Sequence, residues 1–229
     1  MIAAARARRW PAAARVGPPC PRLRGSLQLV LAPAVRWLCA PLAIEGAEHV
    51  ARLAGPTLLV ANHASHLDAP LVLAALPGEV RARLAVAAAE DRFFRSRPLG
   101  LAASLGLGAF PFPRGRGCAV GLLRARRLLE AGWHVLLFPE GTRSRDGRPG
   151  RFRSGAVHLA RSAGVPVLPI GIAGTHALMP PGAAFPRRGP ARLRFGDLWQ
   201  PPVDRDVDEL TALLEARVAE LISPEGDLS

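Results

Sequence analysis

The segment 62–68 holds a histidine and an aspartate at a spacing that suits proton transfer. His63 lies five residues before Asp68, directly after the apolar run Thr57–Ala61, and Pro70 is expected near the start of the next helix. A carboxylate that accepts a hydrogen bond from one ring nitrogen fixes the tautomer and leaves the other nitrogen free to take a proton from an alcohol. We therefore interpret His63 as a general base with Asp68 as its orienting partner. On these two residues alone, a turn in which they only cap a helix stays open, and His66 is expected to pack or cap.

Two further segments contain residues that suit an anionic ligand. Arg114 lies near the end of the segment Gly108–Gly115, and its guanidinium can hold a phosphate through paired, charge-assisted hydrogen bonds. After the run Val135–Phe138 come a carboxylate, a glycine that permits close backbone approach, two hydroxyls and a fixed positive charge, in the order Pro139, Glu140, Gly141, Thr142, Arg143 and Ser144. Both segments can also be read as polar turns with solvated charges.

The charge of the chain favours an anionic partner. All thirty basic residues are arginine, against 18 acidic residues, and the net charge is +12. Residues 1–44 carry seven arginines and no acid, residues 45–196 carry 21 arginines and nine acids, and residues 197–229 carry two arginines and nine acids. A basic body with an acidic end fits a nucleic acid, an anionic membrane or a phosphorylated substrate. We expect the acidic final helix to face away from the site.

Missing residues exclude several mechanisms. The chain has no lysine, which removes the phosphate-loop, Schiff-base and kinase chemistries that depend on one. It has no Gly-x-Ser-x-Gly nucleophile elbow and no His-Glu-x-x-His zinc motif. The three cysteines, Cys20, Cys39 and Cys118, have no ligand spacing, so we expect neither a disulfide framework nor a metal site.

Short apolar runs alternate with helical patterns from residue 57 onward, which predicts an α/β fold. Strands are expected at Thr57–Ala61, Leu84–Ala89, Ala109–Phe112, His134–Phe138, Val165–Ile172 and Ala191–Phe195. Helices are expected at Pro70–Leu76, Gly117–Glu130, Gly155–Ser162 and Val207–Ile222. We predict a single domain over residues 45–229, with a mixed, mostly parallel central sheet flanked by helices. Pro166 and Pro169 predict that their strand is an edge or interrupted strand.

Residues 1–44 are expected to form a basic leader and a membrane-associating segment. Residues 1–25 are rich in Arg, Ala and Pro without periodicity, which predicts an unstructured leader. The stretch Ser26–Ile44 is apolar except for Arg36 and contains two prolines. An arginine in the middle of a membrane span costs about 2.5 to 3.5 kcal/mol. We therefore expect an N-terminal helix that lies in the membrane interface.

Taken in order, these segments resemble the glycerolipid acyltransferase family, in particular its bacterial 1-acylglycerol-3-phosphate (lysophosphatidic acid) acyltransferases. The stretch from Asn62 to Asp68 is similar to the family's Asn-His-x-x-x-x-Asp signature, and Gly108 to Arg114 resembles its second block. Residues 138–144 match Phe-Pro-Glu-Gly-Thr-Arg-Ser at every position, and residues 165–169 resemble the proline-containing fourth block. The resemblance covers roughly residues 45–200.

The resemblance implies acyl transfer from a thioester of coenzyme A or acyl carrier protein to the hydroxyl of lysophosphatidic acid, which gives phosphatidic acid. His63 and Asp68 would be the catalytic pair, and the acceptor site would consist of Arg114, Glu140, Gly141, Thr142 and Arg143. The arginines would bind the phosphate, and Glu140 would order the loop or an arginine. A thioester is already activated, so we expect no cofactor, no metal and no protein nucleophile. The expected partners are the lysophospholipid, the acyl donor and an anionic membrane surface, without nucleic acid. We expect a peripheral or monotopic protein on the cytoplasmic face of the cell membrane.

Several alternatives stay open. Pro113 stands where the family often has an acidic residue, and Ala87–Ala89 replace a strand segment that carries a lysine in many members, so another lysolipid or glycerol 3-phosphate remains a possible acceptor. A lipid hydrolase would need Ser65 as its nucleophile. A nucleic-acid-binding protein is disfavoured because only 5% of the residues are aromatic. A non-catalytic basic membrane-surface protein is the third rival.

Overall fold

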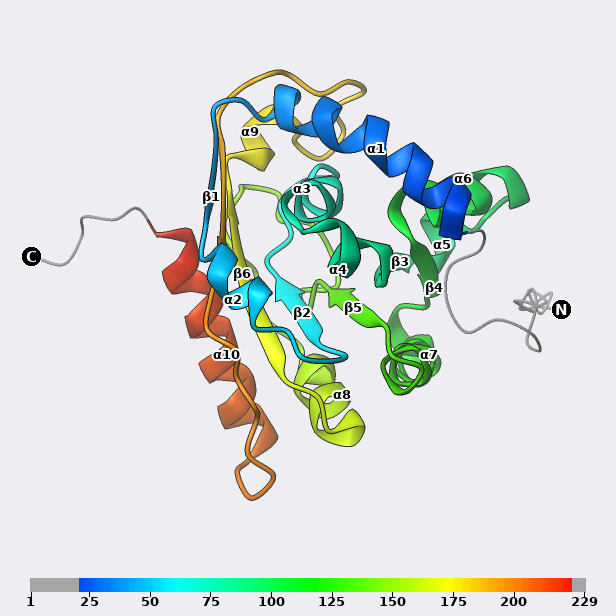
Figure 1. The fold of residues 1–229 in the computed structure, drawn as a ribbon. Coiled ribbons are helices and arrows are strands. Elements are labelled where there is room, and N and C mark those ends of the chain that lie inside the picture. Colours follow the sequence, from blue (N-terminus) through cyan, green and yellow to red (C-terminus); the bar gives the residue numbers. More distant parts are fainter. Residues whose placement is uncertain (1–20, 224–229) are drawn as a thin grey trace, which may run out of the picture.

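A computed structural model describes residues 21–223 of the chain, and they form one seven-stranded sheet covered by helices (Figure 1). The sheet order is β1-β7-β6-β2-β5-β3-β4. Five neighbouring strands, from β6 to β4, run parallel, while β7 is antiparallel to β6 and parallel to β1. The strands are β1 Leu42–Glu45, β2 Leu58–Ala61, β3 Leu84–Ala89, β4 Ala109–Phe112, β5 His134–Leu137, β6 Val167–Ala173 and β7 Ala191–Phe195. The predicted α/β fold with a mixed, mostly parallel sheet is confirmed.

Helices cover both faces of the sheet, and strand residues alternate between the two cores. Leu59 and Ala61 of β2 pack in the core on the side of α1 and α3, whereas Leu58 and Val60 pack on the side of α7, α8 and α10 (Figure 1). The larger helices are α1 Pro21–Leu38, α3 Asp68–Ala75, α6 Arg97–Leu107, α7 Cys118–Glu130, α8 Gly155–Ala163 and α10 Val207–Ile222. Shorter ones are α2 Ala47–Ala51, α4 Gly78–Ala82, α5 Glu90–Phe93 and α9 Thr175–Leu178. The sequence did not predict α6 or these shorter helices.

The N-terminal segment differs from its prediction at both ends. Residues 1–20 of the expected leader lie outside the described residues, but residues 21–25 belong to α1. That helix ends at Leu38, whereas we expected it to continue to Ile44. Leu42–Glu45 instead pairs with β7 as an edge strand, because its backbone groups find partners in the sheet. The expected domain boundary between residues 44 and 45 thus falls inside β1.

Of the two alternatives predicted for the strand with Pro166 and Pro169, the edge position is wrong and the interrupted strand fits the structure. The strand β6 lies inside the sheet, between β7 and β2. Pro166 precedes the strand, and Pro169 lies where the pairing with β7 is irregular, between a single bridge at Val167 and the ladder that starts at Ile170. A missing backbone donor is tolerated at such an interruption.

Two arginines fix α1 to the rest of the fold. The buried guanidinium of Arg24 donates hydrogen bonds to the carbonyls of Arg81 and Ala82 at the end of α4, at 2.9 and 3.4 Å. Arg36 Nε donates to the carbonyl of Ala74 near the end of α3, at 3.1 Å. The last carbonyls of a helix lack partners within the helix and form the negative end of its dipole, so arginines suit these positions. None of the helices between residues 21 and 223 is both long and apolar enough to span a membrane.

Candidate active site

The carboxyl ends of the five parallel strands bring the predicted site residues to one edge of the sheet. This edge is where open α/β folds usually place their ligands. The segments that directly follow these strands carry the site residues. In the order β2, β3, β4, β5 and β6, they carry His63, Arg92, Arg114, Arg143 and Thr175. Residues more than 100 positions apart in the sequence therefore meet in one place.

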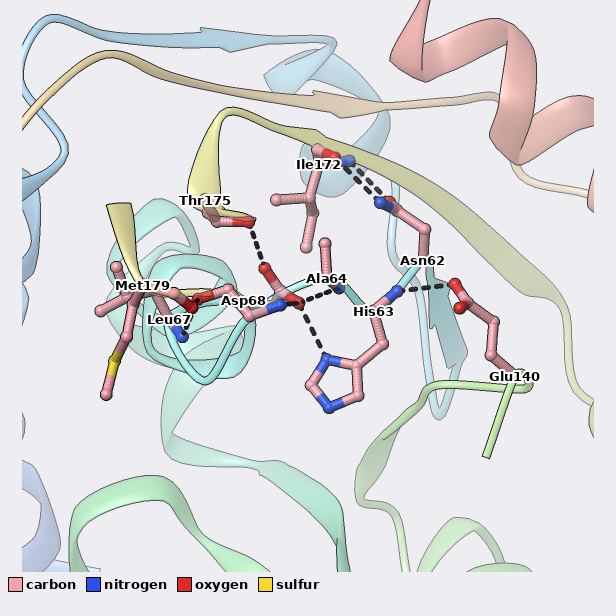
Figure 2. Close-up of polar contacts among 10 residues, drawn as sticks. Asn62, His63, Ala64, Leu67, Asp68, Glu140, Ile172, Thr175 and Met179 are labelled. Carbon is pink, nitrogen blue, oxygen red and sulfur yellow. Dashed lines mark hydrogen bonds and ion pairs between the residues drawn. The ribbon is translucent and has the colours of Figure 1, made fainter. Parts of the chain in front are cut away.

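A fully buried carboxylate organises the turn after β2. Asp68, at the first residue of α3, accepts hydrogen bonds at Oδ2 from His63 Nδ1 at 2.8 Å and from the backbone amides of Ala64 and Ser65 at 2.7 and 2.8 Å (Figure 2). Its other oxygen, Oδ1, accepts from the hydroxyl of Thr175 at 2.6 Å. The positive end of the α3 dipole also favours an acid at this position. The predicted pairing of His63 with Asp68 is thus present in the structure.

These contacts determine the tautomer of His63. Because Oδ2 of Asp68 already accepts two backbone N–H groups, His63 Nδ1 must donate the proton in the third hydrogen bond. The lone pair of Nε2 is then free to accept a proton. The imidazole stacks on the ring of Phe138, with the ring centroids 4.2 Å apart, and its side chain is one-fifth exposed and lines a cavity. The geometry therefore suits a general base.

The backbone on either side of His63 is also held. The side-chain amide of Asn62 forms two hydrogen bonds with the backbone of Ile172, at 2.8 and 2.9 Å, and so ties the end of β2 to β6 (Figure 2). The amide of His63 donates to Glu140 Oε1, and its carbonyl accepts from the amide of Ser144, both at 2.8 Å. The loop after β5 is thus joined directly to the residue that bears the imidazole.

The cavity next to His63 has a volume of about 310 Å³ and combines apolar walls with positive charge. Its apolar lining comes from strand ends and neighbouring helices and includes Val86, Phe93, Leu107, Phe112 and Leu122. Four arginines also line it, namely Arg92, Arg114, Arg143 and Arg153. Among the described residues, no carboxylate belongs to the lining. Such a cavity suits a ligand with an anionic group and an apolar part.

Arg143 has a buried N–H donor that is available for an anion. Its buried Nη1 has no hydrogen-bond partner among the described residues. Burial and the nearby positive charges of Arg92 and Arg114 lower the pKa of the Arg143 guanidinium. An anion in the cavity would provide the missing hydrogen bond and offset the repulsion between these cations.

The other predicted acceptor-site residues take different positions. Gly141 lines the cavity with a φ of +74°, and a Cβ at this position would lie 3.2 Å from Nε of Arg153. Thr142 and Arg114 are exposed at the cavity. Glu140 is not among the lining residues: it is buried, and it accepts hydrogen bonds from the amides of His63 and Gly150. We therefore correct its expected place among the substrate-binding residues, whereas the expected role in ordering the loop fits these two hydrogen bonds.

Several residues of this site escaped the sequence analysis. Thr175 had no distinguishing pattern, and Arg92 could not be separated from the other arginines. Arg153 belongs to a cluster with Arg143 that the sequence indicates for phosphate and donor, but the sequence could not distinguish it within that cluster. His66, expected to pack or cap, lines the cavity and meets the ring of Phe93 edge-on. Burial and the positive charges of Arg143 and Arg92 lower the pKa of His66 to about 4, so this histidine is neutral near pH 7. The acidic helix α10 was expected to face away, yet its Glu215 contacts the loop after β5.

The fold and the site together define an acyltransferase domain. The chain belongs to the Acyltransferase family, whose sequence pattern matches residues 41–173. It is similar to the chloroplastic 1-acyl-sn-glycerol-3-phosphate acyltransferase BAT2 of Brassica napus, with 36% identity over 142 residues that cover 61% of this chain and 39% of that protein. It is also similar to the human 1-acyl-sn-glycerol-3-phosphate acyltransferase alpha, with 34% identity over 129 residues, 56% of this chain and 44% of the human protein.

Among solved structures, the 1-acyl-sn-glycerophosphate acyltransferase PlsC of Thermotoga maritima has a similar fold. The two chains superpose with a TM-score of 0.72 and 26% sequence identity, over 89% of this chain and 80% of that one. The similarity to the curated relatives is more limited, because this chain spans about two fifths of the length of the Brassica napus relative. The predicted family is confirmed.

Glu140 predicts a pH dependence of stability. Burial raises the pKa of its carboxyl from 4.5 to about 7. Between these two values the folded protein binds more protons than the unfolded chain, so the wild type loses stability as the pH rises. Glu140→Gln removes this titration. We expect the free energy of unfolding of the variant, relative to wild type, to increase by about 3 kcal/mol from pH 4 to pH 8.

Denaturant titrations at several pH values measure this difference. The exposed Glu79 provides the control, because Glu79→Gln should show no such trend. A difference between Glu140→Gln and wild type that stays constant from pH 4 to pH 8 would show that Glu140 titrates normally in the folded protein.

Proposed function

We propose that this chain is an O-acyltransferase that moves a fatty acyl group from an acyl-CoA or acyl-carrier-protein thioester to the free hydroxyl of 1-acylglycerol-3-phosphate. The product is phosphatidic acid, an intermediate of phospholipid biosynthesis. The observation that carries this proposal is the His63–Asp68 pair at the wall of a cavity that is partly apolar and lined by four arginines. The names of the similar proteins point to the same acceptor.

The reaction follows from the tautomer of His63. Nε2 of His63 takes the proton of the acceptor hydroxyl while that oxygen attacks the thioester carbonyl carbon. The resulting imidazolium is stabilised by the carboxylate of Asp68. When the tetrahedral intermediate collapses, the C–S bond breaks and the imidazolium returns the proton to the departing thiolate. An ester and a free thiol result, and no cofactor takes part.

Arginine suits the recognition of a phosphate monoester. Each guanidinium stays charged and offers two parallel N–H donors to a phosphate. Arg143 has a buried donor without a partner among the described residues, and Arg114 and Arg153 line the same cavity. We assign the phosphate of the acceptor to these arginines and the acyl chain to the apolar part of the lining. Glycerol 3-phosphate carries the same phosphate monoester, and other lysophospholipids carry a phosphodiester, so a panel of acceptors against both donors would distinguish them.

The hydrolase alternative lacks a suitable nucleophile. The hydroxyl of Ser65 donates to the carbonyl of Met179 at 2.9 Å and accepts from the amide of Leu67 at 3.1 Å. Ser65 is fully buried, and its hydroxyl proton is directed to Met179 rather than to Nε2 of His63, the nitrogen that would have to accept it. This arrangement supports attack by the acceptor hydroxyl instead of attack by Ser65.

The catalytic pair predicts a loss of turnover without a loss of folding. We expect His63→Ala and Asp68→Ala to reduce thiol release from an acyl thioester and lysophosphatidic acid by at least about 100-fold, since a general base contributes about 10²- to 10⁴-fold. The matched control is His158→Ala on the exposed face of α8, which should retain wild-type activity. Circular dichroism checks the fold. Full thiol release by folded His63→Ala would overturn the mechanism.

The phosphate site predicts a change in acceptor affinity. Arg143→Lys retains a positive charge but loses the two parallel donors, so we expect the KM for lysophosphatidic acid to rise about tenfold. The KM for the acyl thioester should stay near its wild-type value. Arg145 lies two residues further along the same loop and its side chain is exposed, so Arg145→Lys serves as the control. An unchanged acceptor KM in Arg143→Lys would remove Arg143 from the phosphate site.

The helix α1 supports the proposal of a membrane surface as a partner. Its side toward the domain includes the buried polar residues Arg24 and Gln28, whereas its outer side exposes large apolar residues, namely Leu23, Leu27, Leu29, Val30 and Trp37. The guanidinium of Arg188 lies over the ring of Trp37 at 5.2 Å, which places positive charge beside the apolar surface. An apolar helix face bordered by cations fits an anionic bilayer. We propose a peripheral or monotopic protein on the cytoplasmic face, where both acyl donors are available.

Vesicle binding tests this part of the proposal. We expect the double variant Leu27→Glu/Val30→Glu to bind phosphatidylglycerol-containing vesicles at least about tenfold more weakly. The reason is that charge replaces apolar area that would be buried in the bilayer. Val203 is three-quarters exposed in the segment before α10, so Val203→Glu is the control. Co-sedimentation measures the bound fraction. Equal binding of the double variant and wild type would remove α1 from the membrane surface.

A further inference from the structure

The loop that carries two of the four cavity arginines has no regular secondary structure. Residues 138–154 connect β5 to α8 and contain five arginines, namely Arg143, Arg145, Arg148, Arg151 and Arg153. A segment of this length without a helix or a strand must be held by individual contacts if its arginines are to keep fixed positions. Its contacts with the body of the protein therefore decide which arginines face the cavity.

Two carboxylates hold the final part of this loop through backbone amides. Glu140 accepts a hydrogen bond from the amide of Gly150 as well as from His63. Glu215 Oε2, on α10, accepts from the amide of Phe152 at 2.7 Å. Hydrogen bonds to a carboxylate are stronger than those between neutral groups. Residues 150–152 are thus attached at two points, one of them supplied by the C-terminal helix.

The hydrogen bond from the Phe152 amide to Glu215 fixes the backbone at Phe152, and with it the position of the next residue, Arg153. The ring of Phe152 is buried in the core that α10 shares with α7 and α8. Arg153 follows directly, lines the cavity, and places its guanidinium against the backbone of Gly141. Its amide donates to the carbonyl of Pro139 at 3.1 Å. The same backbone position therefore directs the side chain of Phe152 into the core and that of Arg153 to the cavity.

We propose that Glu215 is a positioning residue for the acceptor site, which acts through the amide of Phe152 to keep Arg153 at the cavity. This inference rests on the proposed function, because it assigns Arg153 to the acceptor phosphate. The family pattern ends at residue 173, so α10 lies outside the matched region. The C-terminal helix thus contributes to substrate binding as well as to the core.

Hydrogen exchange and kinetics together test this proposal. Glu215→Ala removes the acceptor of the Phe152 amide, so we expect faster exchange in the peptide that contains residues 150–153 and a KM for lysophosphatidic acid that is about tenfold higher. The KM for the acyl thioester should not change. A misplacement of a substrate-binding group by about 1 Å can reduce the rate on the order of 100-fold. Because the hydrogen bond of the Arg153 amide to Pro139 persists in the variant, we expect the smaller, tenfold change in KM.

Two further variants separate positioning from general destabilisation. Glu215→Gln retains an oxygen that can accept the same hydrogen bond, so it should restore both exchange and KM to near wild-type values. Glu220→Ala, at an exposed position on the same helix, should match wild type in both measurements. Melting temperatures report any loss of global stability.

The possible failures are distinguishable. Unchanged exchange at residues 150–153 in Glu215→Ala overturns the positioning role, whatever the enzyme's acceptor is. Faster exchange with an unchanged acceptor KM also overturns it, since the loop contact would then not serve binding. Failure of wild type to release thiol with lysophosphatidic acid contradicts the proposed function itself.

Discussion

The buried carboxylate of Asp68 is the interaction on which the site depends. It accepts four hydrogen bonds, from His63, Ala64, Ser65 and Thr175. A buried charge is costly unless such donors surround it, and the loss of any one donor leaves that cost only partly compensated. The same four bonds shape the turn after β2, orient the imidazole and join the start of α9 to the start of α3. The carboxylate therefore couples the local fold to the orientation and tautomer of His63.

The cavity adds a second electrostatic constraint of opposite sign. Four arginines line it, and the pKa of Arg143 is lowered by burial and by the neighbouring cations. This repulsion opposes the arrangement, and an anion in the cavity would offset it. The loop therefore needs anchors, and two carboxylates outside the cavity lining, Glu140 and Glu215, supply them through backbone amides. In the proposed function, the apolar part of the same cavity accommodates the acyl chain.

Much of this site could be predicted because its central elements are local in sequence. His63 and Asp68 share one turn, and apolar runs located six of the seven strands closely. Thr175 could not be predicted, because it reaches Asp68 only through the pairing of β6 with β2. The start of α1 was misjudged because the buried Arg24 and Gln28 interrupt the apolar pattern of its inner side, to which Val35 and Leu38 also belong. The contact of Glu215 with the loop could not be predicted, because the sequence of an acidic helix does not show which of its carboxylates meets a backbone amide.

The most direct test of the central claim is the tautomer of His63, measured by two-bond ¹H–¹⁵N correlation NMR on protein labelled with ¹⁵N-histidine. The His63→Ala spectrum assigns the signal among the six histidines. Held by Asp68, the neutral imidazole of His63 should carry its proton on Nδ1 and leave Nε2 unprotonated, and Asp68→Ala should abolish this preference. A neutral His63 protonated on Nε2 in the wild type would contradict the account, because it could not accept the proton of the acceptor hydroxyl.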